Sequence, residues 1–168
     1  NSSAAKFSQK LLDFYNNHYL KETDINSLYA YIAKNFSLSD KFIQNPKKIE
    51  IIDLLRVSSN NVIQIIDELS FFQDDPELTE ELLTSIQIDK DLLEKFKVEL
   101  EEMNFNDKLL IGVFLDNFLS NNNLKFPILG KPLRLILTGK PKAPSITDLL
   151  FLIGKENCIS RIEKFLNI

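Results

Sequence analysis

The sequence is poor in the residues that build metal centres, disulfide frameworks and phosphate-binding loops. Its 168 residues include one cysteine, one histidine, four glycines and no tryptophan. The single Cys158 excludes an internal disulfide, and together with His18 it cannot complete a structural zinc site. The glycines stand alone at positions 112, 130, 139 and 154, which excludes a glycine-rich phosphate loop.

Further absences narrow the possible functions. No apolar run approaches the roughly 18 residues that span a bilayer, and Asn1-Ser-Ser-Ala-Ala does not begin a secretory signal. No serine has the flanking glycines of a nucleophile elbow. The carboxylates of Glu77–Glu81 and Glu99–Glu102 suit solvated helix faces better than acid–base catalysis. We expect a cytoplasmic chain with no membrane role, no catalytic residues and no metal ligands, in which His18 and Cys158 are packing residues.

What the chain does contain is enough apolar side chain for a core, and an uneven distribution of charge. Hydrophobic residues make up 44% of the sequence, which argues against disorder. The net charge is −4, but residues 67–102 carry 13 acidic and 3 basic side chains, whereas residues 125–168 carry 8 basic and 3 acidic ones. This asymmetry is compatible with a phosphate-binding face on an acidic body. Solvated helix faces often produce such blocks, so charge alone does not decide.

Apolar periodicity predicts an all-α fold with little competing strand signal. Thr23 or Asp24 caps a helix in the first part, and Asn45-Pro46 opens another, with proline at its first position. Asp74-Asp75-Pro76 breaks the helical run, because a residue before proline is disfavoured in the α region. We therefore predict two helical subdomains, residues 1–76 and 77–168. The expected helical segments include residues 11–19, 25–32, 49–55, 63–72, 77–87, 89–103 and 106–120.

The last forty residues have the clearest helix signals. Pro132 is expected to open a short helix, Leu133–Leu137, which Gly139 ends with a left-handed cap. Lys140–Pro144 then forms a rigid basic loop, and Ser145-Ile-Thr-Asp148 has the pattern of a capping box. Gly154 stops that helix, and residues 157–165 form a closing one.

A cluster of cations and apolar residues lies in this same region. Phosphates attract such cations, and unstacked bases are read by a mixture of stacking, hydrogen bonds and charge. Nucleic-acid binding and ordinary packing both explain the cluster from the residues alone. Its members are Phe126, Lys131, Arg134, Lys140, Lys142, Pro144 and Ile146.

Motifs at both ends of the chain resemble those of one known family. Gly130-Lys-Pro-Leu-Arg-Leu-Ile-Leu-Thr-Gly139, then Ala143-Pro144, Ile153-Gly-Lys-Glu156 and Arg161-Ile162, resemble the end of bacterial-type glutamyl-tRNA synthetases. Near the start, Lys10-Leu-Leu-Asp-Phe-Tyr-Asn-Asn-His-Tyr-Leu20 is similar to that family's K-L-x-W-L-N-G-H-Y-I segment, departing at Asn17. The resemblance spans essentially the whole chain.

The resemblance implies an all-α anticodon-binding region built from two small helical subdomains. The full enzyme uses ATP with magnesium to join glutamate to its tRNA. Its signature motifs belong to a catalytic domain that is absent from this sequence, so the fragment alone is expected to bind no cofactor and to catalyse nothing. The implied partner is the tRNA for glutamate, bound by a monomer. The competing interpretation is a helical protein-interaction module with no role in nucleic-acid binding; a free-standing hydrolase is less consistent with the residues.

Residue roles carried over from the family fall mainly in the C-terminal motifs. Arg134 corresponds to a residue that contacts the anticodon region. Ala143, Pro144 and Ile146 correspond to residues that pack around splayed anticodon bases, although Ala143 lacks the hydroxyl of the threonine often found there. Lys131, Lys140 and Lys142 are expected to give electrostatic support. The alternative for Arg134 is a surface cation with no ligand.

One further position bears on which tRNA is accepted. In strictly glutamate-specific members, an arginine reads the third anticodon base from the break between two helices. The corresponding segment here is Arg56-Val-Ser-Ser-Asn-Asn61, and the favoured register places Ser58 at that position. We hypothesise that this base is read less strictly, so that the tRNA for glutamine is accepted as well. A register shifted by two residues would instead give the role to Arg56.

Overall fold

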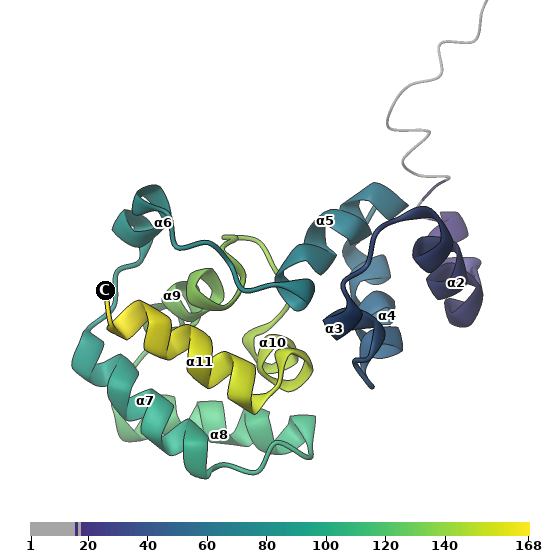
Figure 1. Cartoon of the computed structure of the whole chain (residues 1–168). Coiled ribbons are helices and arrows are strands. Elements are labelled where there is room, and N and C mark those ends of the chain that lie inside the picture. Colours follow the sequence, from purple (N-terminus) through teal and green to yellow (C-terminus); the bar gives the residue numbers. More distant parts are fainter. Residues whose placement is uncertain (1–15, 17) are drawn as a thin grey trace, which may run out of the picture. The chain divides into compact units, whose positions relative to one another are not determined.

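The computed structural model describes residue 16 and residues 18–168. These residues form helices joined by loops and contain no strand, which confirms the all-α prediction (Figure 1). They form two compact units that divide between Gln73 and Asp74, three residues before the predicted boundary. Part of the first predicted helix, together with Asn17, lies outside the described residues, whereas residues 18–22 are helical. No helix among the described residues is long and apolar enough to cross a membrane.

In the described part of the first unit, four helices follow the helical residues 18–22, and one of the four was not expected from the sequence. Asp24 caps the first of them as predicted, because its carboxylate accepts the Ser27 N–H at 2.9 Å. The additional helix is a single turn capped by Ser39, whose hydroxyl accepts the Phe42 N–H. The helices are α2 Ile25–Asn35, α3 Asp40–Ile43, α4 Lys48–Ser58 and α5 Val62–Gln73.

The predicted opening of α4 at Asn45-Pro46 is wrong by two residues. The Asn45 side chain accepts the Lys47 N–H at 2.8 Å, which makes a local turn rather than a helix cap. The helix therefore begins at Lys48, with Lys47 at the cap position and no side-chain cap. α4 packs against α2 and α5, and Ile51, Ile52 and Leu55 of α4 are completely buried.

The second unit contains six helices. α7 packs against α11, α8 against α10, and α9 against both α10 and α11. Their apolar faces meet in a core that includes three phenylalanines, with the Phe96 and Phe118 rings 5.1 Å apart in an edge-on arrangement. The helices are α6 Glu80–Ser85, α7 Lys90–Glu102, α8 Lys108–Asn121, α9 Phe126–Thr138, α10 Ile146–Ile153 and α11 Lys155–Leu166.

Three boundaries in the second unit differ from the sequence predictions. α6 begins only at Glu80, because the Thr79 hydroxyl accepts the Leu82 N–H and caps it there. The cap of α8 is Asp107 rather than Asn106, since its carboxylate accepts the Leu109 N–H at 2.8 Å. The third difference is the largest: α9 begins at Phe126 with a proline in its first turn, so Pro132 lies inside the helix instead of opening it.

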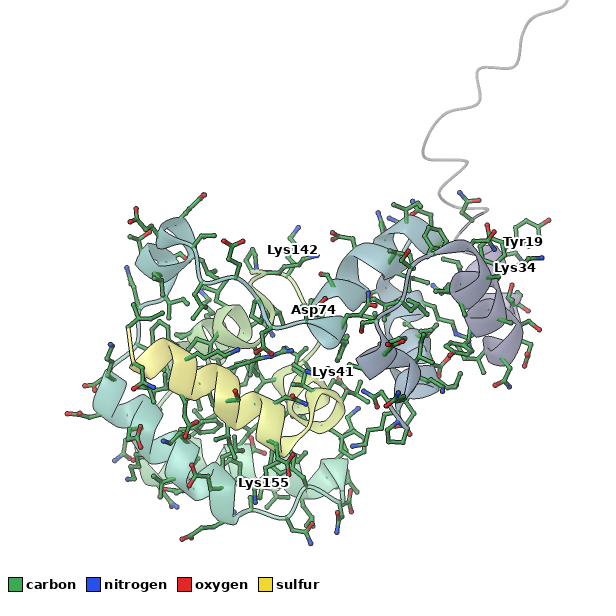
Figure 2. All side chains as sticks on the ribbon, viewed as in Figure 1. Tyr19, Lys34, Lys41, Asp74, Lys142 and Lys155 are labelled. Atoms are coloured by element: carbon green, nitrogen blue, oxygen red, sulfur yellow. The ribbon has the colours of Figure 1, made fainter. Side chains whose placement is uncertain are left out.

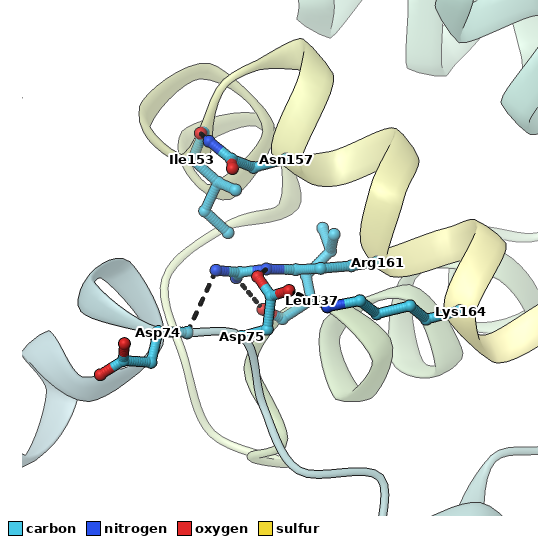
Figure 3. A network of polar contacts seen from close by, with 7 residues as sticks. All are labelled: Asp74, Asp75, Leu137, Ile153, Asn157, Arg161 and Lys164. Carbon is cyan, nitrogen blue, oxygen red and sulfur yellow. Dashed lines mark hydrogen bonds and ion pairs between the residues drawn. The ribbon is translucent and has the colours of Figure 1, made fainter. Parts of the chain in front are cut away.

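A buried arginine holds the first residues of the second unit in place (Figure 3). The Arg161 side chain is only 2% exposed. Its Nε donates to the Asp75 carboxylate at 3.0 Å, one terminal nitrogen donates to the Leu137 carbonyl at 2.5 Å, and the other donates to the Asp74 carbonyl at 3.2 Å. Lys164 also contacts the Asp75 carboxylate. Arg161 thereby fastens the segment that follows α5 to both α9 and α11.

Candidate functional site

The C-terminal residues singled out from the sequence lie on α9, on the loop after it and at the start of α10. The loop is fixed at its first residues. Gly139 adopts a left-handed backbone with φ of 69°, and its N–H donates to the Leu135 carbonyl at 2.8 Å. The buried Thr138 hydroxyl bonds the Arg134 carbonyl at 2.7 Å and accepts the Lys140 N–H at 3.1 Å. The chain therefore leaves α9 along a defined path.

The far end of the loop that follows α9 is fixed by the predicted capping box at the start of α10. The Ser145 hydroxyl accepts the Asp148 N–H at 3.1 Å and contacts the Asp148 carboxylate at 2.5 Å. Lys108 of α8 forms an ion pair with that carboxylate. Because both ends are hydrogen-bonded, the backbone of the loop is held in one conformation at each end.

Arg134 is the unusual cation of this region. It is half-buried on α9, and its Nε is buried with no hydrogen-bond partner. Within the described ranges, no hydrogen bond or ion pair joins its guanidinium to another residue. Buried N–H donors are normally satisfied, and an unsatisfied one costs about 1–3 kcal/mol. Arg134 therefore keeps an unmet hydrogen-bond donor within this fold.

The neighbouring cations differ in how they are placed. Lys131, one helical turn before Arg134, is exposed, as is Lys142, which projects from the loop in Figure 2. Neither has an ion pair in the part of the chain that the structure describes. Lys140 is half-buried and has its own interactions. Lys131 and Lys142 thus add exposed positive charge to the helix that carries Arg134 and to the loop that follows it.

The apolar residues of the predicted site divide into two kinds. Ala143 and Pro144 are half-buried and keep part of their surface open. Ile146 is 1% exposed, so the expectation that it offers an apolar surface to a ligand is wrong. As the first residue of α10, it turns its side chain into the core beneath the loop. It supports the loop from below.

Sequence reasoning missed the cavity beside this segment. It has a volume of about 370 Å³ and lies between α6 and the end of α9. Leu135, Gly139 and Pro141 line one side of it, and Thr79 and Glu81 line the other. Neither Arg134 nor Pro144 lines it. Of the lining residues, Gly139 was predicted as a helix stop and Pro141 as part of the loop, but neither indicated a cavity.

Arg56 and Ser58 lie in the first unit and differ in their surroundings. One terminal nitrogen of Arg56 donates to the Thr23 carbonyl at 2.7 Å, and the other forms an ion pair with Asp53 at 2.7 Å. Ser58 is exposed at the end of α4, and its hydroxyl donates to the Leu55 carbonyl at 3.2 Å. The Arg56 guanidinium therefore has an internal structural role, whereas the Ser58 side chain is accessible.

The next residues of that segment also have structural roles. The Asn61 side chain accepts the Gln64 N–H at 3.0 Å, while the Gln64 side chain accepts the Asn60 N–H at 2.7 Å. This reciprocal pair caps the start of α5. Among the described residues, no group of three or more histidine, cysteine, aspartate or glutamate side chains could hold a metal ion.

Comparison with known proteins gives a consistent result. Residues 6–166 match the family described as "Anticodon binding domain". Glutamate–tRNA ligase 1 of Helicobacter pylori strain P12 is 33% identical over 170 residues, which cover 99% of this chain and 36% of the relative. Glutamate–tRNA ligase of Methylobacillus flagellatus is 30% identical over 171 residues, with the same coverage. The chain thus spans about a third of the length of these relatives.

Solved structures agree with this likeness. A glutamate tRNA ligase from Elizabethkingia meningosepticum, in complex with its amino acid, superposes with a TM-score of 0.78 at 25% identity. A glutamate-tRNA synthetase from Elizabethkingia anophelis gives a TM-score of 0.78 at 26% identity. Each comparison covers 96% of this chain and 32% of the other.

Proposed function

Because this chain belongs to the anticodon-binding domain family, we propose that it is the tRNA-binding part of an enzyme that joins glutamate to tRNA. The chain spans 36% of the Helicobacter pylori relative, and the rest of such an enzyme would use ATP, magnesium and glutamate. The role of these 168 residues is then to grip the anticodon arm of the tRNA for glutamate. Such an enzyme would act as a cytoplasmic monomer in protein synthesis.

The observation that carries the proposal is the Arg134 side chain on α9, whose buried Nε has no hydrogen-bond partner. A planar guanidinium donates two parallel hydrogen bonds to a phosphate or to the edge of a guanine. RNA would satisfy the donor that the protein leaves free. Lys131 and Lys142 would attract the backbone to this face. The open edges of Ala143 and Pro144 would give an unstacked base an apolar surface, supported from beneath by Ile146.

Binding of an anticodon stem–loop RNA to the purified chain tests this proposal. Replacing Arg134 with Ala removes the donors and should weaken binding by about 1–3 kcal/mol. It should also reduce the slope of log affinity against log salt concentration by about one. Arg134→Lys keeps the charge but loses the planar fork, so it should recover the salt slope and only part of the affinity.

The matched control is Lys95→Ala, which removes an exposed cation from α7 that bonds Asn122. It should leave RNA binding within about twofold of the original, as expected for a charge away from the contact surface. Equal affinity of the Arg134→Ala variant and the unaltered chain would remove Arg134 from the site. Equal weakening by both substitutions would show that overall charge, rather than this site, sets the affinity.

We also infer that the third anticodon base is read without an arginine. The internal bonds of Arg56 to the Thr23 carbonyl and to Asp53 support this, because a guanidinium held in this way is not free to reach a base. The accessible residue of the segment is Ser58, whose short side chain gives little discrimination. A parent enzyme of this kind would then accept the tRNA for glutamine beside that for glutamate.

The test compares stem–loop RNAs that differ only at the third anticodon base. The unaltered chain should bind them with affinities within about twofold, and Ser58→Arg should create a preference of about 1–3 kcal/mol for one base. Val57→Arg places the same charge on the neighbouring exposed residue and serves as the control. A strong preference in the unaltered chain would refute the inference.

A further inference from the structure

An apolar face of α8 is left uncovered in the second unit. Leu109, Leu110 and Val113 expose 77%, 48% and 56% of their surfaces within little more than one helical turn. Single exposed apolar residues are common, but adjoining ones of this size mark a contact surface. Leu110 and Val113 also line a groove of about 320 Å³ along α8 and the end of α7. We refer to it as the α7–α8 groove.

The floor of the α7–α8 groove is already formed. Phe114 and Phe118 line it, and both rings pack against Phe96, at centroid distances of 5.6 and 5.1 Å. Phe96 is completely buried, so the two floor rings are held from below. A partner would therefore meet a preformed apolar surface and would not need to open the core.

The charge on α7 is balanced on one side only. On the side that meets α11, Lys97 pairs with Glu94 at 3.0 Å and with Glu163 at 3.4 Å. These hydrogen bonds raise the pKa of Lys97, so Lys97 stays protonated and keeps its ion pairs with Glu94 and Glu163 at ordinary pH values. Glu99, which lines the groove, and Glu102, one turn further along, have no ion pair with any described residue.

Cations close to the groove do not cancel this charge. Lys108 at the start of α8 is already paired with Asp148. Lys155, labelled in Figure 2, donates at 2.9 Å to the carbonyl of Met103, a residue that lines the groove. Lys95, one turn before Glu99 on α7, donates to the Asn122 side chain at 2.6 Å. Against these two cations stand Glu99, Glu102 and the exposed Asp116 of α8. The surface is thus apolar at its centre and acidic along its edges.

We propose that the α7–α8 groove binds a basic amphipathic helix of a partner protein. The partner's apolar side chains, spaced three and four residues apart, would seat on Leu110, Val113 and the phenylalanine floor. Its flanking lysines or arginines would pair with Glu99 and Glu102, which lack partners in the isolated chain. RNA is a poor occupant because carboxylates repel phosphates, and a second copy would bring like charges face to face. The groove is separate from Arg134 and does not depend on the RNA-binding proposal.

Isotope-labelled chain titrated with synthetic peptides tests the proposal. The probe is a helical peptide of about four turns with leucines on one face and lysines beside them. One control peptide has glutamates in place of the lysines, and another has the same composition in shuffled order. The first peptide should shift the backbone amide signals of residues 99–118, and both controls should bind at least about tenfold more weakly.

Variants of the chain identify the surface. Leu110→Ser with Val113→Ser removes apolar contacts, and Glu99→Lys with Glu102→Lys reverses the edge charge; each pair should weaken binding about tenfold. The matched control is Val57→Ser with Ile63→Ser, which removes exposed apolar side chains of the first unit and should leave binding unchanged. Thermal unfolding checks that each variant is folded, and any variant that unfolds is replaced by its single substitutions.

Several results would overturn the proposal. Equal binding of the lysine and glutamate peptides would remove the role of the acidic edge. Amide shifts outside the groove, or no binding at all, would show that the groove is not the docking surface. Sedimentation would reveal the remaining occupant: self-association that Leu110→Ser with Val113→Ser abolishes would make the groove an interface between two copies.

Discussion

Replacement of Arg161 should destabilise the second unit more than any other single loss of charge in it. Arg161→Met keeps most of the aliphatic length of the side chain but removes the guanidinium that bonds Asp75, Asp74 and Leu137. The buried Leu137 carbonyl and the partly buried Asp74 carbonyl then lose a donor, and the Asp75 carboxylate keeps only Lys164. Removing one partner of a buried pair costs about 3–5 kcal/mol. The Asp75 side chain is 30% exposed and can recruit water, so we expect the lower end, about 3 kcal/mol.

Urea unfolding followed by the amide signals of α9 and α11 measures this loss apart from the first unit. The control is Lys164→Met, which removes the other cation at Asp75. Lys164 is 56% exposed, so that change should cost no more than about 1 kcal/mol. A loss below about 1 kcal/mol for Arg161→Met would refute the view that this buried network holds the unit together.

The same network predicts a dependence on pH. Burial alone would raise the pKa of Asp75, but hydrogen bonds from Lys164 and Arg161 outweigh it and hold the pKa below its ordinary value of 3.8. A carboxyl whose pKa is lowered on folding stabilises the fold above its unfolded value, and the contribution is lost as the pH falls through the folded value. Stability should therefore decline below about pH 4, and Asp75→Asn should flatten that decline. A decline of unchanged steepness in Asp75→Asn would assign the effect to other carboxyls.

Further substitutions and one labelling reaction test the local structure of the second unit. Gly139→Ala should destabilise by about 1–2 kcal/mol, because φ is 69° and the new Cβ would lie 3.1 Å from Pro76 Cβ. Gly112→Ala should instead stabilise the fold by up to about 1 kcal/mol, because nothing lies within 4 Å of the new Cβ. Urea unfolding in which Gly112→Ala is less stable than Gly139→Ala would contradict both expectations. Burial raises the pKa of Cys158 to about 12, so thiol reagents at neutral pH should label it only after denaturant is added, and ready labelling of folded chain would count against its burial. Ser145→Ala removes the cap of α10 and should cost about 1 kcal/mol, whereas Ser145→Asp should retain it; equal losses in thermal unfolding would show that the cap is not the cause.

Features with strong local chemistry were predictable from the sequence. Gly139, Gly154 and the Ser145 cap lie where expected, because a left-handed backbone or a side-chain cap depends on only a few neighbouring residues. α9 shows the limit of such reasoning. Its two prolines both fit a first-turn position, and the local sequence does not choose between them. In the structure Pro127 occupies the first turn, and the Phe126 ring fills the space that a side chain at Gly130 would need.

Properties that depend on distant packing were not predictable. Ile146 reads as a loop-end apolar residue, and its burial follows from the packing of α10 against α8 and α9. The lack of a partner for the Arg134 Nε likewise depends on the side chains that surround α9 after folding. Arg161 was recognised as part of a motif, yet its bonds to Asp74 and Asp75 cross more than half of the chain. Arg56 was open to two roles, and only its bonds to Thr23 and Asp53 separate them.

The large sequence separation between Arg161 and its partners also has a consequence for synthesis on the ribosome. Its partners at Asp75 and Asp74 precede it by 86 and 87 residues. The first unit can form while the nascent chain is still being made, but the junction after α5 stays unfastened until α11 emerges. Contacts of such high sequence separation form late. A product interrupted before residue 161 would therefore keep a loose junction, and exposed backbone of this kind is a preferred site of proteolytic cleavage.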